Sequence, residues 1–135
     1  MDRLDVAIGI VTRGQRVLIC QRRADNTFGD CWEFPGGKLE AGETPEACVV
    51  REVFEEVGIH VRPTTALEVI DHDYPHGSIL LRPYLCEHLT GEIELLACQD
   101  ARWITPAALQ GFQFPPANGP LIEHVIRRLC HPHPI

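Results

Sequence analysis

One stretch decides the fold of this 135-residue chain: Gly37-Lys-Leu-Glu-Ala-Gly-Glu43-Thr-Pro-Glu-Ala-Cys-Val-Val-Arg51-Glu52-Val-Phe-Glu55-Glu56-Val-Gly58-Ile59. It begins at a glycine turn and continues into an acidic segment that carries the signals of a helix. Thr44 suits an N-cap, Pro45 suits the first turn, and Gly58 suits the position just after the last turn. The stretch therefore predicts one helix between Thr44 and Gly58.

The predicted helix has two chemically different faces. At about 100° per residue, Glu52, Glu55 and Glu56 fall within an arc of roughly 100°. Like charges at this spacing repel by a few tenths of a kcal/mol, and hard cations such as Mg²⁺ and Mn²⁺ favour carboxylate oxygens. The glutamates alone leave two readings open, a metal site or a solvated acidic face. The opposite, apolar face is expected to consist of Ala47, Val50, Val53, Phe54 and Val57.

The glycines and Arg51 extend this pattern into a longer motif. Written as G-x5-E-x7-R-E-U-x-E-E-x-G-U, with U apolar, the run fits the Nudix box at every specified position: Gly37, Glu43, Arg51, Glu52, Val53, Glu55, Glu56, Gly58 and Ile59. The chain therefore resembles the Nudix hydrolase family. The resemblance implies an α/β sandwich with a mixed β-sheet between helices, formed by a single domain over residues 1–135, and an enzyme that hydrolyses a diphosphate bond.

The resemblance also implies roles for the motif residues. It assigns the metal to Glu52, Glu55, Glu56 and the backbone carbonyl of Gly36, with Mg²⁺ as the cofactor and Mn²⁺ as an alternative. Glu52 is the first candidate for the general base, and Glu43 or a glutamate outside the box are the alternatives. Glu43 and Arg51 are expected to pair and to hold the glycine turn against the helix.

Bulk properties exclude several other classes of protein. The length suits one domain with a real core, and no apolar run approaches a transmembrane span. The N-terminus is charged and does not resemble a signal peptide, so we expect a cytoplasmic protein. The net charge of −7 disfavours a nucleic-acid surface. We therefore predict no nucleic-acid, membrane or protein partner, while the resemblance to Nudix hydrolases implies a small nucleotide as the substrate.

The cysteines and the C-terminal histidines are not expected to form a covalent framework. Six cysteines occur without a C-x-x-C pair, so we expect reduced and mostly buried thiols. Cys130, His131 and His133 lie beside two prolines, which is more typical of a flexible tail over residues 131–135 than of a metal site.

Strand and turn signals order the rest of the chain. Residues 4–13 and 16–22 predict a hairpin, in which Gly9 indicates either a close backbone approach or a bulge. Pro83 is expected to place its strand at a sheet edge or at a bulge. Further strands are predicted at 65–73, 78–87, 92–96 and 101–104, a turn at 74–77, and helices at 107–110 and 121–129.

Several residues outside the helix are candidates for substrate contacts. Arg22 and Arg23 are adjacent on a strand and point to opposite faces, so the residues alone do not select one; the resemblance to the MutT-like members of the family assigns the phosphate contact to Arg22. Lys38 is expected to offset phosphate charge together with it. The turn after Phe34 lets the backbone approach a ligand, and Phe34 itself suits base stacking, the core, or both. The predicted substrate-binding set is Arg22, Glu33, Phe34, Pro35, Gly36, Lys38 and Asn118.

The segment Phe114-Pro-Pro-Ala-Asn118 bears on the choice of base. An Asn amide reads a purine edge with two hydrogen bonds, but Asn118 also suits an N-cap of the last helix. MutT-like enzymes carry the same five residues, so the resemblance favours hydrolysis of 8-oxo-dGTP to a monophosphate and pyrophosphate. The alternatives are a CTP or dCTP pyrophosphohydrolase and a non-catalytic module that binds a damaged base.

Two departures from the MutT-like pattern weaken the assignment of individual residues. Where those enzymes supply a further metal-ligand glutamate, this chain has Ala97, with Glu94 or Asp100 as candidate replacements. Where they place an arginine beside the base, this chain has His76-Gly77. We therefore expect a different metal shell and a looser choice of base.

Overall fold

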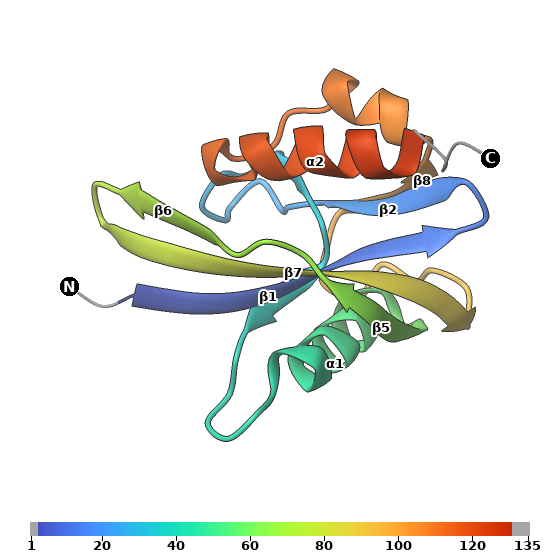
Figure 1. The fold of residues 1–135 in the computed structure, drawn as a ribbon, viewed down its shortest axis with the longest axis horizontal. Coiled ribbons are helices and arrows are strands. Elements are labelled where there is room, and N and C mark those ends of the chain that lie inside the picture. The colour runs from blue at the N-terminus through green and yellow to red at the C-terminus, as the bar shows by residue number, and fades with distance from the viewer. Residues whose placement is uncertain (1–2, 131–135) are drawn as a thin grey trace.

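A mixed β-sheet lies between two helices, one on each face (Figure 1). The computed structural model describes residues 3–130. The elements follow in the order β1 (Arg3–Arg13), β2 (Arg16–Gln21), β3 (Trp32–Glu33), β4 (Gly36–Lys38), α1 (Pro45–Val57), β5 (His60–Ala66), β6 (Ile70–Tyr74), β7 (Gly77–Thr90), β8 (Asp100–Ile104), the 3₁₀ helices η1 (Pro106–Gly111) and η2 (Pro116–Asn118), and α2 (Gly119–Cys130).

The sheet is built around one parallel pair of long strands. Its main path runs β3-β2-β1-β7-β5, while β4 pairs with β1, β6 with β7 and β8 with β2. The β1–β7 pair is parallel from Arg3↔Ser78 to Thr12↔Glu87, and the other pairs are antiparallel. This confirms the predicted mixed sheet between helices and the hairpin of β1 and β2.

Helix α1 has the predicted ends but a different buried face. Thr44 accepts a hydrogen bond from the Ala47 amide, and Gly58 closes the helix at φ 72°. The predicted apolar face was wrong at Ala47, which is exposed, and at Phe54, which is 46% exposed and stacks on His60 at 4.7 Å. Val50 is only half-buried. The buried residues are Cys48, Val49, Val53 and Val57.

Gly9 explains this rotation of the buried face. A Cβ atom at Gly9 would lie 3.0 Å from Val49 Cγ1 and 3.4 Å from Val53 Cγ2. The glycine therefore leaves a groove in β1 that receives the row of valines spaced by four residues along α1. The close-approach reading of Gly9 is confirmed, and its amide donates to Pro35 O at 2.8 Å.

Two strand predictions around Pro83 need correction. The predicted strand 65–73 is divided between β5 and β6, with a break at residues 67–69. Of the two alternatives for Pro83, the edge was wrong, because β7 lies between β1 on one side and β5 and β6 on the other; the irregularity is present, but in the neighbouring chain. Pro83 lies opposite the break, where no strand residue faces its nitrogen, so the N–H that proline lacks is not needed for the sheet. Its carbonyl accepts a hydrogen bond from Leu67 N at 2.9 Å.

The predicted short strand at residues 92–96 was also wrong. This segment crosses the end of α1, where Glu94 N donates to Val57 O at 2.9 Å and Leu96 N to Glu56 O at 3.1 Å. It satisfies carbonyls that the end of a helix leaves unpaired. The predictions for β8, α2, the turn at 74–77 and a brief helix near 107–110, here a 3₁₀ helix, are confirmed.

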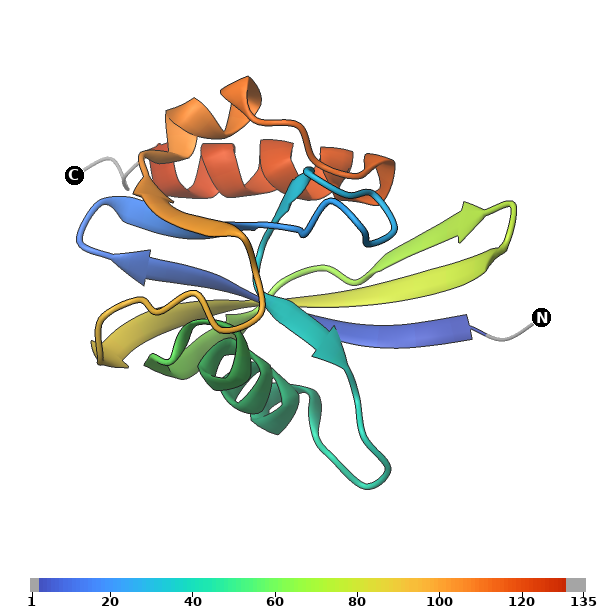
Figure 2. The ribbon, with the colours of Figure 1, turned by 180° about the vertical axis from the view of Figure 1, so that it is seen from behind.

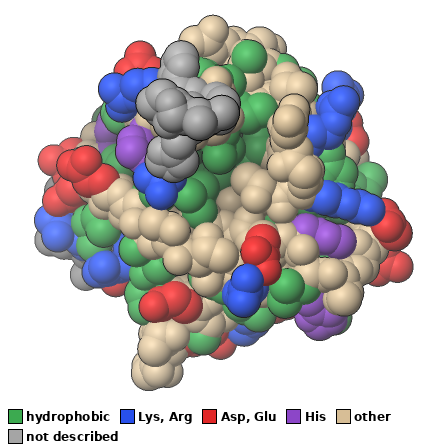
Figure 3. All heavy atoms as spheres, turned by 45° about the vertical axis from the view of Figure 1, so that its right-hand side comes forward, with side chains coloured by type: hydrophobic (Ala, Val, Ile, Leu, Met, Phe, Trp, Pro, Cys, Tyr) green, Lys and Arg blue, Asp and Glu red, His purple; other side chains and the backbone are tan. Residues whose placement is uncertain are grey.

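The remaining general expectations can be compared with the described residues. All six cysteines are free and all except Cys130 are buried, as predicted. Within residues 3–130, no helix is long and apolar enough to cross a membrane. The predicted flexible tail at 131–135, with His131 and His133, lies outside the described residues. Figure 3 shows acidic and basic side chains interspersed on one face rather than a single field of one sign.

Candidate active site

A cleft of about 620 Å³ opens between β1, the glycine turn, the β6–β7 hairpin and η2. All the predicted substrate residues except Pro35 line it: Arg22, Glu33, Phe34, Gly36, Lys38 and Asn118. Pro35 is buried beneath it, with its carbonyl bonded to β1. Phe34 is only 1% exposed and packs 5.4 Å from Phe114, so the core role is observed and its ring presents little surface to a ligand.

Arg22 is held at the wall of the cleft by two oxygen acceptors. Its Nη1 donates to Glu33 Oε1 at 2.7 Å, and its Nε donates to Thr27 O at 2.8 Å. Burial raises the pKa of Glu33, and Arg22 opposes that shift. Arg23 is exposed and is not among the lining residues. The structure therefore distinguishes the two arginines, which strand alternation alone did not.

Gly36 and Gly37 allow α1 to pack closely against the glycine turn. Both residues belong to β4, which leads into the loop before the helix (Figure 2). The Gly36 amide donates to Glu56 Oε2 at 2.8 Å. A Cβ atom at Gly37 would lie 2.3 Å from the Glu52 carboxyl carbon, and a Cβ atom at Gly36 would lie 2.2 Å from Ala7 O. The turn thus brings Glu52 and Glu56 against its own backbone, at the edge of the cleft.

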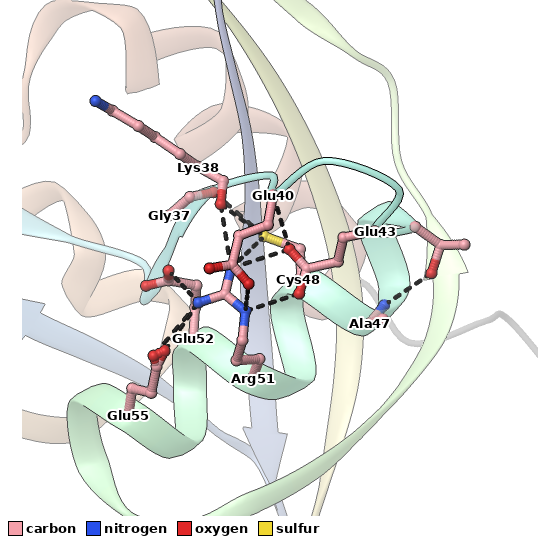
Figure 4. Close-up of polar contacts among 10 residues, drawn as sticks. Gly37, Lys38, Glu40, Glu43, Ala47, Cys48, Arg51, Glu52 and Glu55 are labelled. Carbon is pink, nitrogen blue, oxygen red and sulfur yellow. Dashed lines mark hydrogen bonds and ion pairs between the residues drawn. The ribbon is translucent and has the colours of Figure 1, made fainter.

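Arg51 lies at the centre of the acidic cluster (Figure 4). Its guanidinium donates to both carboxylate oxygens of Glu43, at 2.7 and 3.0 Å, which confirms the predicted pair. It also donates to Glu52 at 2.9 Å and to Glu55 at 2.8 Å. Its Nη2 reaches Lys38 O at 3.2 Å, while the Lys38 side chain points away from the cluster.

The electrostatics distinguish Glu43 from Glu52 and Glu56. Hydrogen bonds from Arg51 and from the Glu40 amide lower the pKa of Glu43 to about 2. Burial, with a smaller contribution from the charge of Glu33, raises the pKa of Glu56 to about 9, and burial also raises the pKa of Glu52. Glu43 is therefore a fixed anion in an ion pair, whereas Glu52 and Glu56 are carboxylates whose charge lacks full compensation.

The donor atoms fit a hard divalent cation. Glu52 and Glu56 bring carboxylate oxygens to the turn that carries the Gly36 carbonyl, and oxygen is the ligand type that Mg²⁺ and Mn²⁺ prefer. No three acidic, His or Cys side chains among residues 3–130 form a ready-made site, and Glu55 is engaged by Arg51. The position of the donors supports the expected metal residues without completing a coordination shell.

Neither of the residues considered as replacements at Ala97 lines the cleft. Asp100 accepts from the Ala101 amide at 2.8 Å and from Arg102 Nε at 3.1 Å. Glu94 lies against the far end of the helix, with Oε2 2.9 Å from the position of a Cβ atom at Gly58. Neither side chain is placed as a substitute for the absent glutamate.

Asn118 lies in η2, directly before α2, and is 8% exposed. Its Nδ2 reaches Pro115 O at 3.5 Å. In the described part of the chain, no amide of α2 donates to its side chain, so the capping reading receives no support. The sequence predictions missed Tyr74, which also lines the cleft and whose hydroxyl accepts from the Ala117 amide at 3.1 Å.

Two further residues of the cleft wall escaped the sequence analysis. Thr27 and Phe28 come from the polar loop after β2, and Phe28 adopts a positive φ of 57°. An aromatic residue within a polar loop was the one available signal. Gln99 lies outside the cleft but anchors this loop, because its Nε2 donates to Arg22 O at 2.6 Å and to Asp30 Oδ1 at 2.5 Å.

The chain is similar to several known proteins. A family model described as NUDIX domain matches residues 6–124. The 8-oxo-dGTP diphosphatase of Escherichia coli K12 is 38% identical over 128 residues, covering 94% of this chain and 99% of that protein. The CTP pyrophosphohydrolase of the same organism is 28% identical over 123 residues, covering 91% of each. The solution structure of the E. coli ORF135 protein superposes with a TM-score of 0.84 at 27% identity, covering 99% of this chain and 96% of that one.

Proposed function

The chain belongs to the Nudix family of hydrolases, and we propose that it hydrolyses a nucleoside triphosphate to the monophosphate and pyrophosphate, with 8-oxo-dGTP as its preferred substrate and Mg²⁺ or Mn²⁺ as its cofactor. The observation that carries this proposal is the position of Glu52 and Glu56 against the glycine turn, because Gly36 and Gly37 of that turn line the cleft that also contains Arg22, Lys38 and Asn118. Negative donors for a metal thus lie directly behind the wall of the cavity that holds positive groups for phosphates and an amide for a base.

The family generally depends on divalent metal ions, and the chain's own oxygen donors suit one. When bound by Glu52, Glu55, Glu56 and the Gly36 carbonyl, such an ion would lower the pKa of a bound water and offset phosphate charge. Arg22 and Lys38 would balance the charge that develops on the phosphates during cleavage. Arg22 is already restrained by Glu33 and Thr27, so little rotamer freedom is lost when it binds a phosphate.

Glu52 remains the candidate for the general base. Burial raises its pKa, which makes its carboxylate a better proton acceptor than an ordinary glutamate. Glu43 is a poorer candidate, because two hydrogen bonds from Arg51 occupy both its oxygens and hold its pKa at about 2. We assign Glu43 and Arg51 to holding the turn against the helix.

Asn118 is proposed to select the base. Its side chain borders the cleft with only one long bond to the protein, so its carboxamide is available to a ligand. An amide oxygen accepts from a purine N7–H, which 8-oxoguanine carries and guanine lacks, while the amide nitrogen donates to O6. This arrangement favours the oxidised base.

The proposal is tested by pyrophosphate release from a panel of nucleotides that includes 8-oxo-dGTP, dGTP and CTP, with Mg²⁺ and with EDTA. We expect metal-dependent cleavage with the highest kcat/KM for 8-oxo-dGTP. Glu55→Gln should fold normally and lose turnover by about 10²-fold or more. A Glu55→Gln enzyme with a near-normal Mg²⁺-dependent rate would contradict the metal assignment.

The same panel examines the role of Asn118. Asn118→Ala should lower kcat/KM for 8-oxo-dGTP by about tenfold or more relative to dGTP, because a bidentate base contact is worth about 1–3 kcal/mol. An equal loss for both nucleotides would favour a role in the conformation of η2 instead.

A second candidate is a pyrophosphohydrolase for CTP, which is favoured by the relative with that activity that spans 91% of the chain. Highest kcat/KM for CTP in the panel would establish it. The non-catalytic module is disfavoured because every glutamate of the box is present.

A further inference from the structure

Tyr74 joins three separate segments at the cleft. It is the last residue of β6 and pairs with Gly77 across the hairpin turn. Its ring lies parallel to His76, with centroids 5.4 Å apart and planes at 9°, and 5.4 Å from Phe28 of the loop after β2. Its hydroxyl accepts the amide of Ala117 in η2 at 3.1 Å. One side chain therefore links the hairpin, the Arg22 loop and the turn that carries Asn118.

The amide of Ala117 needs an acceptor from outside its own helix. The first amides of a helical turn have no partner within it, and η2 has no side-chain cap. Pro115 and Pro116 contribute no N–H, so Ala117 is the first donor in this run. Ala117 is 2% exposed, and a buried amide must find a protein partner where water is excluded. Tyr74 supplies that partner from across the cleft.

We propose that Tyr74 is a positioning residue for base selection: its hydroxyl fixes η2 through the Ala117 amide and so sets the orientation of the neighbouring Asn118. The inference rests on the proposed function, because it concerns how the same cleft chooses its base. Asn118 has only a 3.5 Å bond of its own side chain to hold it, so the orientation of its amide depends on the backbone that carries it. Within the turn, Asn118 N donates to Pro115 O at 3.0 Å and Gly119 N donates to Pro116 O. The hydroxyl of Tyr74 adds a restraint on this backbone from another segment of the chain, at the residue next to Asn118.

Tyr74→Phe removes this one hydrogen bond and keeps every ring contact. A neutral hydrogen bond has a net value that corresponds to about 3- to 10-fold in an equilibrium. We expect the ratio of kcat/KM for 8-oxo-dGTP to that for dGTP to fall by about 3- to 10-fold, because the loss falls mainly on the oxidised nucleotide. An equal loss for both nucleotides would show a general structural role and would overturn the proposal.

The chain contains a matched control. Tyr84 is the only other tyrosine, and its hydroxyl donates to Glu46 at 3.5 Å. It packs against the α1 face of the sheet, whereas Tyr74 packs against the α2 face. Tyr84→Phe should leave the selectivity ratio unchanged. A similar loss in Tyr84→Phe would mean that loss of either tyrosine hydroxyl has this effect, and the proposal would fail.

A double variant separates positioning from direct contact with the base. If Tyr74 acts through Asn118, then Tyr74→Phe should lower the ratio no further in an Asn118→Ala background. An additive loss would place the hydroxyl on the base itself and overturn the inference.

Amide hydrogen exchange gives a readout that does not depend on the substrate. The Ala117 amide should exchange at least about threefold faster in Tyr74→Phe than in the wild type or in Tyr84→Phe. Unchanged exchange overturns the proposal. If the nucleotide panel reveals a different preferred base, the proposed substrate is wrong. The role of Tyr74 is still supported in that case if Tyr74→Phe loses the preference for that base and the Ala117 amide exchanges faster.

Discussion

Gly36 and Gly37 are adjacent in the turn, but a side chain at each position would collide with a different kind of atom. A substitution at Gly36 should therefore mainly lower the stability of the fold, and one at Gly37 should mainly lower the activity. At Gly36, an added Cβ atom would lie 2.2 Å from Ala7 O and 2.6 Å from Ile8 Cα, both of which are backbone atoms of β1. At Gly37, it would lie 2.3 to 2.6 Å from the carboxylate of Glu52, the mobile end of a side chain. We therefore compare Gly36→Ala with Gly37→Ala.

The structure gives the size of each effect. Gly36→Ala must move β4 away from β1 by about 1 Å, because ordinary contacts begin near 3.4 Å, and such overpacking costs about 1–3 kcal/mol of unfolding free energy. Gly37→Ala displaces the Glu52 carboxylate and breaks its 2.9 Å bond to Arg51. Since Arg51 keeps its other partners, the cost is only about 1 kcal/mol or less. Loss of a positioned general base lowers kcat by about 10²- to 10⁴-fold.

Two measurements decide the comparison. Urea unfolding should show a clear loss of stability for Gly36→Ala and a small one for Gly37→Ala. Pyrophosphate release under saturating Mg²⁺ should show a loss in kcat for Gly37→Ala far beyond any change in the folded fraction. Gly111→Ala is the control, because no atom lies within 4 Å of its added Cβ. A folded Gly37→Ala enzyme with normal kcat would refute the placement of Glu52 in the chemistry.

Three further predictions follow from single contacts. The ion pair with Arg51 holds the pKa of Glu43 at about 2, below the ordinary 4.5. This pair therefore stabilises the fold above about pH 4.5, and its contribution is lost as the pH falls toward 2. In urea unfolding at pH 7, Glu43→Gln should be less stable than the wild type, and the difference should shrink between about pH 5 and pH 3. Gly9→Ala should cost about 1–3 kcal/mol in urea unfolding, and combining it with Val49→Ala should cost less than the sum of the two single changes, because the crowded Cγ1 atom at 3.0 Å is removed; full additivity would contradict the contact. Arg22→Ala should raise KM by about tenfold or more while Arg23→Ala leaves it unchanged, and equal effects in steady-state kinetics would show that the cleft wall does not distinguish them.

Local sequence signals predicted the two ends of α1 correctly but did not predict correctly which of its faces is buried. Thr44 and Gly58 act through their own backbone neighbours, so their roles can be read from the sequence. Which apolar side chains are buried depends on the surface that receives them, and here that surface is the groove left by Gly9. Val49 therefore replaces Phe54 in the core, although both residues are apolar.

Pro83 illustrates the same limit in the sheet. A proline in a strand indicates an irregularity, but the sequence does not say on which strand the irregularity falls. In the structure, β7 continues through Pro83 and the neighbouring chain is interrupted instead, between Ala66 and Ile70. The interruption depends on residues far apart in sequence and is therefore not visible in the local pattern.

The motif predicted which acidic residues gather at the site but not how their charges are balanced. Because like charges repel, clustered glutamates on one helix face left two interpretations open, a bound cation or a solvated acidic face. Arg51 already provides a positive charge between Glu43, Glu52 and Glu55. The members of the cluster therefore differ in how they are held: Glu55 is half exposed and paired with Arg51, whereas Glu56 is held at the Gly36 amide.

This division explains why Glu55→Gln is the sharpest test of the metal assignment. Removing the Glu55 charge leaves Arg51 with bonds to Glu43 and Glu52, so the fold and the glycine turn should persist. An exposed ion pair of this kind contributes only about 0–1 kcal/mol, too little to account for a large loss of activity through unfolding. A fall in kcat of about 10²-fold with unchanged urea stability can then be attributed to the lost metal ligand, whereas unchanged kcat would leave Glu55 as a partner of Arg51 alone.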